Sequence, residues 1–142
     1  MAEFLLERFL PYQLAVLAAR VSREFSSVYA ERFGLGIAEW RVLAHLHDAG
    51  PVSVREIHRR VDMDKSKVSR AASRLETAGL ISKEPNAEDR RLLRLALTGK
   101  GQAVMAELAP LALDFEARLL SRLGADAPAF RALLERLLAG TP

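Results

Sequence analysis

Residues 64 to 81 read DKSKVSRAASRLETAGLI, and their side chains are sorted by type at helical spacing. At about 100° per residue, the apolar members fall within about a third of a helix surface. These are Val68, Ala71, Ala72, Leu75 and Ala78. The opposite side carries Lys67, Arg70 and Arg74, with Ser66, Ser73 and Thr77 beside them and Ser69 at the edge. The pattern predicts a helix that packs its alanines on a core and exposes a cationic face.

That face has two interpretations. Lys and Arg are common on the solvated side of an ordinary amphipathic helix. A solvated helix, however, usually mixes charges of both signs to gain i,i+4 pairs, and Lys67, Arg70 and Arg74 have no acid among them. Small side chains beside long cations also let a helix lie deep in the DNA major groove. The pattern therefore favours a DNA-facing helix.

The preceding residues predict three helices. Apolar residues recur at helical spacing from Pro11 to the GLG of residues 34–36, and again in IAEWRVLAHLHDAG at residues 37–50. Ser53 and Glu56 form a capping-box pattern at the start of SVREIHRRV, residues 53–61. Asp64 is then placed to cap the helix of residues 64–79.

The following residues predict a hairpin and two more helices. LISKEP and LLRLALT bracket the polar loop NAEDRR, which is typical of two strands with a charged tip. Thr98 can cap a long helix that contains Pro110, and a last helix follows Asp126. The fold class is mainly α with a small β-hairpin wing, a winged helix-turn-helix flanked by N- and C-terminal dimerisation helices.

The predicted organisation has three parts. Residues 1–36 form an N-terminal dimerisation helix, residues 37–100 a winged helix-turn-helix lobe that binds DNA, and residues 101–142 the C-terminal dimerisation helices. We assign dimerisation to the ends because amphipathic helices at both termini need a second surface on which to bury their apolar stripes.

Charge is concentrated in the middle of the chain. Residues 53–100 contain 12 Lys and Arg against 7 Asp and Glu, a net +5, whereas residues 1–52 and 101–142 each have a net charge of −1. There are no cysteines, which excludes disulfides and thiolate metal sites. No secretion signal or membrane-spanning run is indicated, so the expected location is the cytoplasm.

The loop at residues 86–91 is the second basic element. It is either a solvated hairpin tip or a wing in which Arg90 and Arg91 reach phosphates or the minor groove while Asp89 orients one guanidinium. A basic hairpin that follows a basic helix-turn-helix favours the wing.

The spans WRVLAHL, DKSKVSRAASRLETAGLI and PNAEDRRLLRLALTGKG resemble the MarR family of bacterial winged-helix transcription regulators. The resemblance covers nearly the whole chain, and DRR followed by LTGKG is its most specific part. It implies a homodimer that binds a pseudo-palindromic operator in double-stranded DNA, most often as a repressor. The matching recognition-helix positions are Ser66, Lys67, Ser69, Arg70 and Arg74. The matching wing positions are Asp89, Arg90 and Arg91. Ser53, at the start of the preceding helix, could hold a phosphate through backbone amides.

The resemblance also implies a small aromatic or phenolic effector bound between the dimer helices and the DNA lobe. Tyr12, Arg20, Trp40 and His45 are candidates to line its site, although Tyr12 and Trp40 could instead be packing residues and Arg20 a surface residue. Many ligand-responsive relatives carry a basic residue soon after the position of Tyr12. This chain has Gln13 there and no cation between Tyr12 and Arg20, which argues against an acidic ligand.

The sequence indicates neither an enzyme nor a metalloprotein. His45 and His47 are two residues apart on a helix and cannot bind one ion together, and no catalytic set or phosphate loop is present. We expect no cofactor and no metal. The alternative function is a winged-helix interaction module that docks an acidic protein through the same basic stripe.

Overall fold

The structure is a computed structural model that describes residues 2–89 and 92–140. The chain divides into two compact units, residues 1–108 and residues 109–142. These units are defined by packing alone. The assignment of residues 1–36 and 101–142 to dimerisation and of residues 37–100 to DNA binding therefore stays a prediction.

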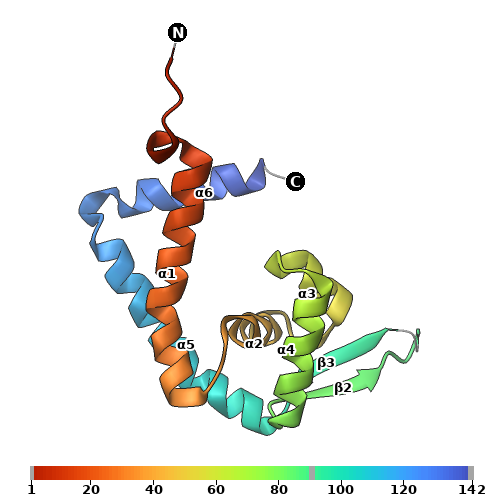
Figure 1. The fold of residues 1–142 in the computed structure, drawn as a ribbon. Coiled ribbons are helices and arrows are strands. Elements are labelled where there is room, and N and C mark those ends of the chain that lie inside the picture. Colours follow the sequence, from red (N-terminus) through yellow and green to blue (C-terminus); the bar gives the residue numbers. More distant parts are fainter. Residues whose placement is uncertain (1, 90–91, 141–142) are drawn as a thin grey trace. The chain divides into compact units, whose positions relative to one another are not determined.

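The first unit contains a three-helix lobe. A single 3₁₀ turn, η1 (Leu6–Arg8), precedes α1 (Leu10–Phe33), and α2 (Ile37–Ala49), α3 (Val54–Val61) and α4 (Lys65–Thr77) follow. Gly34 ends α1 with a φ of 66°, a left-handed conformation that glycine adopts without strain. Helices α2, α3 and α4 lie together beside the hairpin of β2 and β3 (Figure 1).

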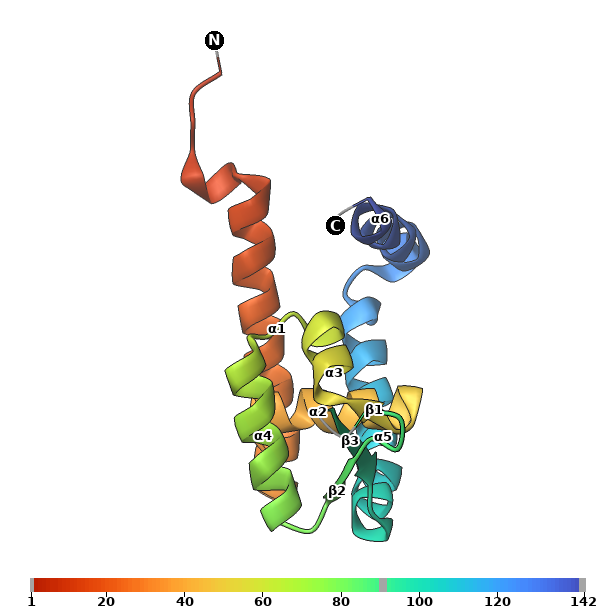
Figure 2. The same ribbon diagram turned by 90° about the vertical axis from the view of Figure 1, so that its right-hand side faces the viewer.

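The hairpin belongs to a three-stranded antiparallel sheet, because a third strand joins the two that were predicted. Strands β2 (Ile81–Pro85) and β3 (Leu93–Leu97) pair from Ile81 opposite Leu97 to Pro85 opposite Leu93. The two-residue strand β1 (Val52–Ser53) pairs with the other edge of β3, as Figure 2 shows. Two residues are too short to show the alternation by which a strand is recognised in a sequence.

The core of the lobe is closed by the alanine face of α4. Val68, Ala71, Ala72 and Leu75 are at most 1% exposed, and they pack with buried side chains of the other elements. These include Val42 and Leu43 of α2, Ile57 of α3 and Leu95 of β3. Ala78, which was predicted on this face, is exposed because α4 ends at Thr77. The predicted fold class is confirmed.

Helix α5 (Gly99–Ser121) begins in close contact with the end of α4. The Thr98 hydroxyl donates to the Gly79 carbonyl at 2.6 Å and accepts from the Gly101 N–H at 3.1 Å, so Thr98 caps α5 as predicted. Lys100 donates from Nζ to the Ala78 carbonyl at 2.9 Å. We call these three contacts the α4–α5 clasp.

The second unit consists of the last part of α5, a 3₁₀ turn η2 (Gly124–Asp126) and α6 (Ala127–Ala139). Asp126 precedes α6, but its side chain makes no capping hydrogen bond. None of the described residues of α6 is buried within this chain. Over residues 2–89 and 92–140, no helix is both long and apolar enough to cross a membrane.

Candidate nucleic-acid interface

The predicted recognition-helix residues share the exposed side of α4. Ser66, Lys67, Ser69, Arg70 and Arg74 are all exposed, while Val68 between them is completely buried. The buried side fixes the rotation of α4 about its axis, because rotating the helix by the angle between two adjacent residues, about 100°, would expose the core positions. The cations and hydroxyls therefore form one outward surface.

The start of α4 is held by Asp64, as predicted. Its Oδ1 accepts the Lys67 N–H at 2.8 Å and the Ser66 hydroxyl at 2.7 Å. These two hydrogen bonds, with smaller contributions from the charges of Lys67 and Arg70, lower the pKa of Asp64. Because the Ser66 proton is donated to Asp64, the Ser66 oxygen faces a partner only as an acceptor.

The turn between α3 and α4 has its own hydrogen bond. Asp62 adopts a left-handed conformation, with a φ of 51°, and Nδ1 of His58 lies 2.6 Å from the Met63 carbonyl oxygen. A carbonyl only accepts, so Nδ1 of His58 must carry the proton. His58 thus has a structural role in setting the angle between the two helices.

Ser53 is 8% exposed, and its hydroxyl accepts the Glu56 N–H at 3.2 Å. The side chain is therefore a helix cap, and any contact of Ser53 with a phosphate would use the backbone. Beside it lies a polar pocket of about 440 Å³ between α3, α4 and the hairpin. Its lining consists of Ser53, Val54, Arg55, Lys65, Ser69, Asp89, Leu92 and Leu93.

Arg55 and Lys65 were not among the predicted site residues. Each lies in the first turn of its helix, Arg55 in α3 and Lys65 in α4, on the side where Ser69 and Asp89 also lie. A cation in the first turn after a helix cap is the sequence signal for both residues, although neither belongs to the regular stripe of α4.

The hairpin tip is described only in part, because Arg90 and Arg91 lie outside the described residues. Asn86 Oδ1 accepts the N–H groups of Glu88 at 2.8 Å and Asp89 at 3.3 Å, which shapes the start of the loop. Asp89 lines the polar pocket. The predicted roles of Asp89, Arg90 and Arg91 remain predictions.

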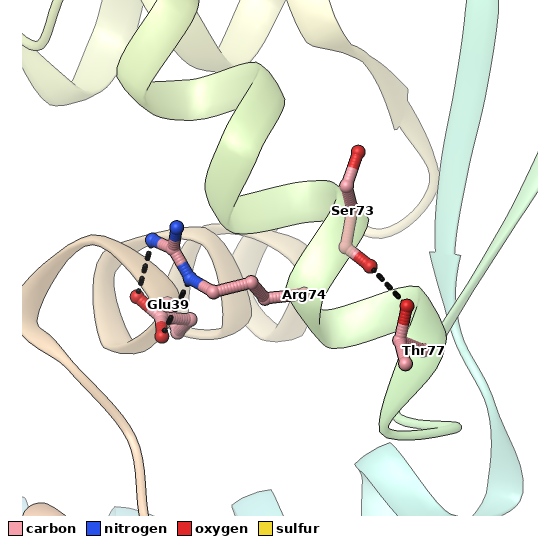
Figure 3. A network of polar contacts seen from close by, with 4 residues as sticks. All are labelled: Glu39, Ser73, Arg74 and Thr77. Atoms are coloured by element: carbon pink, nitrogen blue, oxygen red, sulfur yellow. Dashed lines mark hydrogen bonds and ion pairs between the residues drawn. The ribbon is translucent and has the colours of Figure 1, made fainter.

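Two of the hydroxyls on the outer side of α4 are engaged within the protein. Thr77 donates to the Ser73 carbonyl at 3.0 Å, a contact visible in Figure 3. Nζ of Lys83 in β2 donates to the Ser73 hydroxyl at 2.9 Å and lies 3.9 Å from Oε1 of Glu76, with which it forms an ion pair. The two contacts of Lys83 attach β2 to the last turns of α4.

Arg74 is paired with an acid that the sequence pattern did not reveal. Its Nε and Nη2 donate to Oε1 and Oε2 of Glu39 in α2, each at 3.2 Å (Figure 3). This bidentate contact raises the pKa of Arg74. Lys67, Arg70 and Arg74 have no acid among them in the sequence of α4, yet a helix that begins 28 residues earlier supplies one to Arg74.

The four predicted effector residues do not gather around one cavity. Tyr12 and Arg20 are exposed on α1. Trp40 packs in an aromatic cluster, with ring centroids 5.1 Å from Phe25 and 5.8 Å from Tyr29. In His45, burial lowers the pKa, and Nε2 is buried with no hydrogen-bond partner among the described residues.

A different set of residues lines an open cavity of about 500 Å³ between α1 and α2. They are Ala18, Ala19, Ser22, Arg23, Ser26, Ile37 and Arg41. Two guanidinium groups beside an apolar wall suit a small anion with a hydrophobic body. Arg23 and Arg41 were not predicted, because their convergence depends on how α1 packs on α2. Over the described part of the chain, no three His, Asp or Glu side chains come together as a metal site.

Comparison with known proteins places this arrangement in a family. Residues 33–92 match the MarR family model, a span that runs from the last residue of α1 to the residue before β3. Over 78 residues the chain is 37% identical to the HTH-type transcriptional repressor MdtR of Bacillus subtilis, an alignment that covers 55% of this chain and 50% of MdtR. The crystal structure of a MarR/EmrR family transcriptional regulator from Acinetobacter sp. ADP1 is 28% identical with a TM-score of 0.84, over 96% of both chains. The middle of the chain, residues 33–92, is thus similar to the MarR family.

The MarR fold extends over almost the whole chain. The structure of Bordetella bronchiseptica BpsR, described for regulation of its DNA binding by 6-hydroxynicotinic acid, has a TM-score of 0.85 over 99% of this chain and 100% of that one. At 20% identity this likeness concerns the fold alone. The chain spans about half the length of MdtR. The predicted MarR resemblance is confirmed, and the relatives bear the names of regulators and not of enzymes.

Proposed function

We propose that this chain is a homodimeric transcription regulator of the MarR type that binds a pseudo-palindromic operator and represses by occluding a promoter. The observation that carries the proposal is the outward face of α4, where Lys67 and Arg70 stand exposed over a completely buried Val68. Such a helix can enter a major groove while its apolar side stays in the lobe. Its site of action would be the cytoplasm, where bacterial DNA is found.

Contacts to phosphates and contacts to bases have different places on this surface. The polar pocket, with Arg55 and Lys65 at the first turns of α3 and α4, is suited to the DNA backbone, as are Arg90 and Arg91 of the wing. Ser66, Ser69 and Arg70 lie on the exposed face of α4, which would supply base contacts. Phosphate contacts give affinity and salt dependence, and base contacts give specificity.

Support for the homodimer comes from apolar side chains exposed at both ends of the chain. Phe9, Leu10 and Leu14 at the start of α1 are 42–55% exposed, and Leu133 and Leu138 of α6 are 50% and 65% exposed. Apolar side chains grouped on one helix are usually covered by a partner. A second copy is the partner that a palindromic operator requires.

The decisive experiment is selection of bound duplexes from a random pool with the purified protein. A palindromic consensus is expected, with half-sites about one helical turn apart, roughly 34 Å. Binding that is equally tight to selected and random duplexes, and that changes little between low and high salt, would favour the interaction module with an acidic protein partner.

We also propose that a small aromatic acid binds the cavity between α1 and α2 and releases the operator. The two guanidinium groups of Arg23 and Arg41 supply the cations that the start of α1 lacks, and Ala18, Ala19 and Ile37 supply an apolar wall. The compound named for BpsR, 6-hydroxynicotinic acid, is a suitable first probe.

Arg23→Gln tests this effector site, with Arg20→Gln as its matched control. Arg20 is exposed on the same helix but does not line the cavity. Titration calorimetry should show binding that is lost in the first variant and kept in the second. Equal binding by both variants would remove the cavity from consideration.

A further inference from the structure

The contact between Arg74 and Glu39 joins an exposed cation to a sheltered acid. The side chain of Arg74 is 55% exposed, whereas that of Glu39 is only 13% exposed. Glu39 binds the guanidinium along one edge, through Nε and Nη2. Both N–H groups of Nη1 and one of Nη2 are left for another acceptor, because a guanidinium has five donors.

Glu39 is itself held in place. It is the third residue of α2, and its carboxylate lies over Gly36, where a Cβ atom would be 3.0 Å from Oε2. Burial by itself would raise the pKa of Glu39, but the hydrogen bond from Arg74 and those from the N–H groups of Glu39 and Gly36 more than offset it and lower the pKa. Glu39 is therefore ionised at neutral pH, and both Arg74 and the start of α2 hold its carboxylate in place.

A fixed pair of this kind changes what Arg74 does on DNA. Attraction to DNA of any sequence depends on unpaired positive charge, since each neutralised phosphate releases counterions. The Glu39–Arg74 pair has no net charge and adds little to that attraction. The fixed guanidinium still offers directed donors, which act only where an acceptor stands in the right place.

We propose that Glu39 is a specificity-determining residue: it cancels the charge of Arg74 toward DNA of any sequence and holds the guanidinium for a directed contact in the operator. The proposal rests on the DNA-binding function proposed above. Glu39 acts through Arg74 and is a positioning residue. Lys67 and Arg70 on the same face make no ion pair with the described residues, so they supply the sequence-independent attraction.

The test is Glu39→Gln, with affinities measured on the selected operator and on random duplex from 50 to 200 mM salt. Gln at the third position of a helix can still bond the capping N–H, so the fold should be retained, which a denaturation curve checks. On random duplex, the variant should bind more tightly at low salt. Its slope of log affinity against log salt should steepen by about 0.9, an additional loss of about 3.5-fold over this range. Operator affinity should rise less, so the ratio of operator to random affinity falls.

Two further variants separate charge at this site from charge elsewhere. Glu31→Gln removes the same charge from an exposed position of α1 and should leave the slope and the ratio near wild type. The double variant Glu39→Gln, Arg74→Gln removes a neutral pair. Its slope on random duplex should return to wild type, while its operator affinity should be reduced.

The outcomes distinguish this proposal from the function on which it rests. If the wild type binds operator and random duplex as expected but Glu39→Gln leaves the slope unchanged, Glu39 has only a structural role and the proposal fails. An equal rise on both duplexes would also overturn it, because Glu39 would then act through charge alone. A wild-type protein that binds no duplex would overturn the proposed function as well.

Discussion

Gly101 in the first turn of α5 lies directly against Leu80, so closely that a Cβ atom on Gly101 would overlap the Leu80 carbonyl oxygen. No space remains for any side chain there, because the Leu97 side chain closes another side. The second glycine of the TGKG segment, Gly101, is thus required because α5 lies so close to the residues that follow α4.

Gly101→Ala should lower the free energy of unfolding by about 1–3 kcal/mol, the usual cost of forcing an additional carbon into a packed site. Urea denaturation measures the change. Gly99→Ala is the matched control, because a Cβ atom at Gly99 has no neighbour within 4 Å. Gly99→Ala should leave stability unchanged or slightly higher, as alanine is the better helix former. Equal losses in the two variants would contradict the close approach.

Asp64 should make the stability of α4 depend on pH. Its pKa is lowered in the folded protein, so its stabilising contribution is present above the unfolded value of about 3.9 and is lost as pH falls through the folded value. Asp64→Asn keeps an efficient cap but cannot titrate. We expect wild type and variant to have similar denaturation midpoints at pH 7, with the wild type losing more stability below pH 4. Parallel curves throughout would show that Asp64 is not the titrating cap.

His58 should exist as the Nδ1-protonated tautomer when its ring is neutral, because Nδ1 faces the Met63 carbonyl oxygen at 2.6 Å. Long-range ¹H–¹⁵N correlation spectra distinguish the two ring nitrogens. The spectrum of His58 should show a protonated Nδ1 and an unprotonated Nε2. The side chain of His47 is exposed and makes no hydrogen bond with the described residues, so its ring provides an internal reference. A protonated Nε2 in neutral His58 would rule out the hydrogen bond.

Leu138→Glu should convert the proposed homodimer to monomer without unfolding the chain. Leu138 is 65% exposed in α6, so a charge there costs little in an isolated chain, but it would have to be buried in a dimer that covers this helix. We expect the dimer dissociation constant to rise at least about tenfold, a difference of roughly 1.4 kcal/mol in the free energy of association. Sedimentation velocity at micromolar protein measures this change. Ala132→Glu adds the same charge on another side of α6 and should remain dimeric. A Leu138→Glu protein that stays dimeric would place the interface elsewhere.

The sequence predicts α4 well because its two sides differ so sharply. Val68, Ala71, Ala72 and Leu75 form the core face, and Asp64 and Gly79 mark the ends by local rules that need no tertiary information. The same holds for the Ser53 cap of α3 and the Thr98 cap of α5. Most signals that lie within one turn of helix are predicted correctly, with the exception of Asp126, whose side chain makes no capping hydrogen bond.

What the sequence does not reveal depends on packing between distant segments. Glu39 and Arg74 are 35 residues apart, so the stripe of α4 looked free of acids. Arg23 and Arg41 converge only because α1 lies beside α2. Strand β1 is recognisable only once β3 is in place to pair with it.

The α4–α5 clasp joins the residues after α4 to the start of α5. The carbonyls of Ala78 and Gly79 after α4 are bonded by Lys100 and Thr98, so the usual fraying of a helix end is suppressed there. Helix α4 cannot detach without also releasing the start of α5. In native-state hydrogen exchange, the amides of the last turn of α4 and the first turn of α5 should therefore exchange through one shared opening event, as a single cooperative unit.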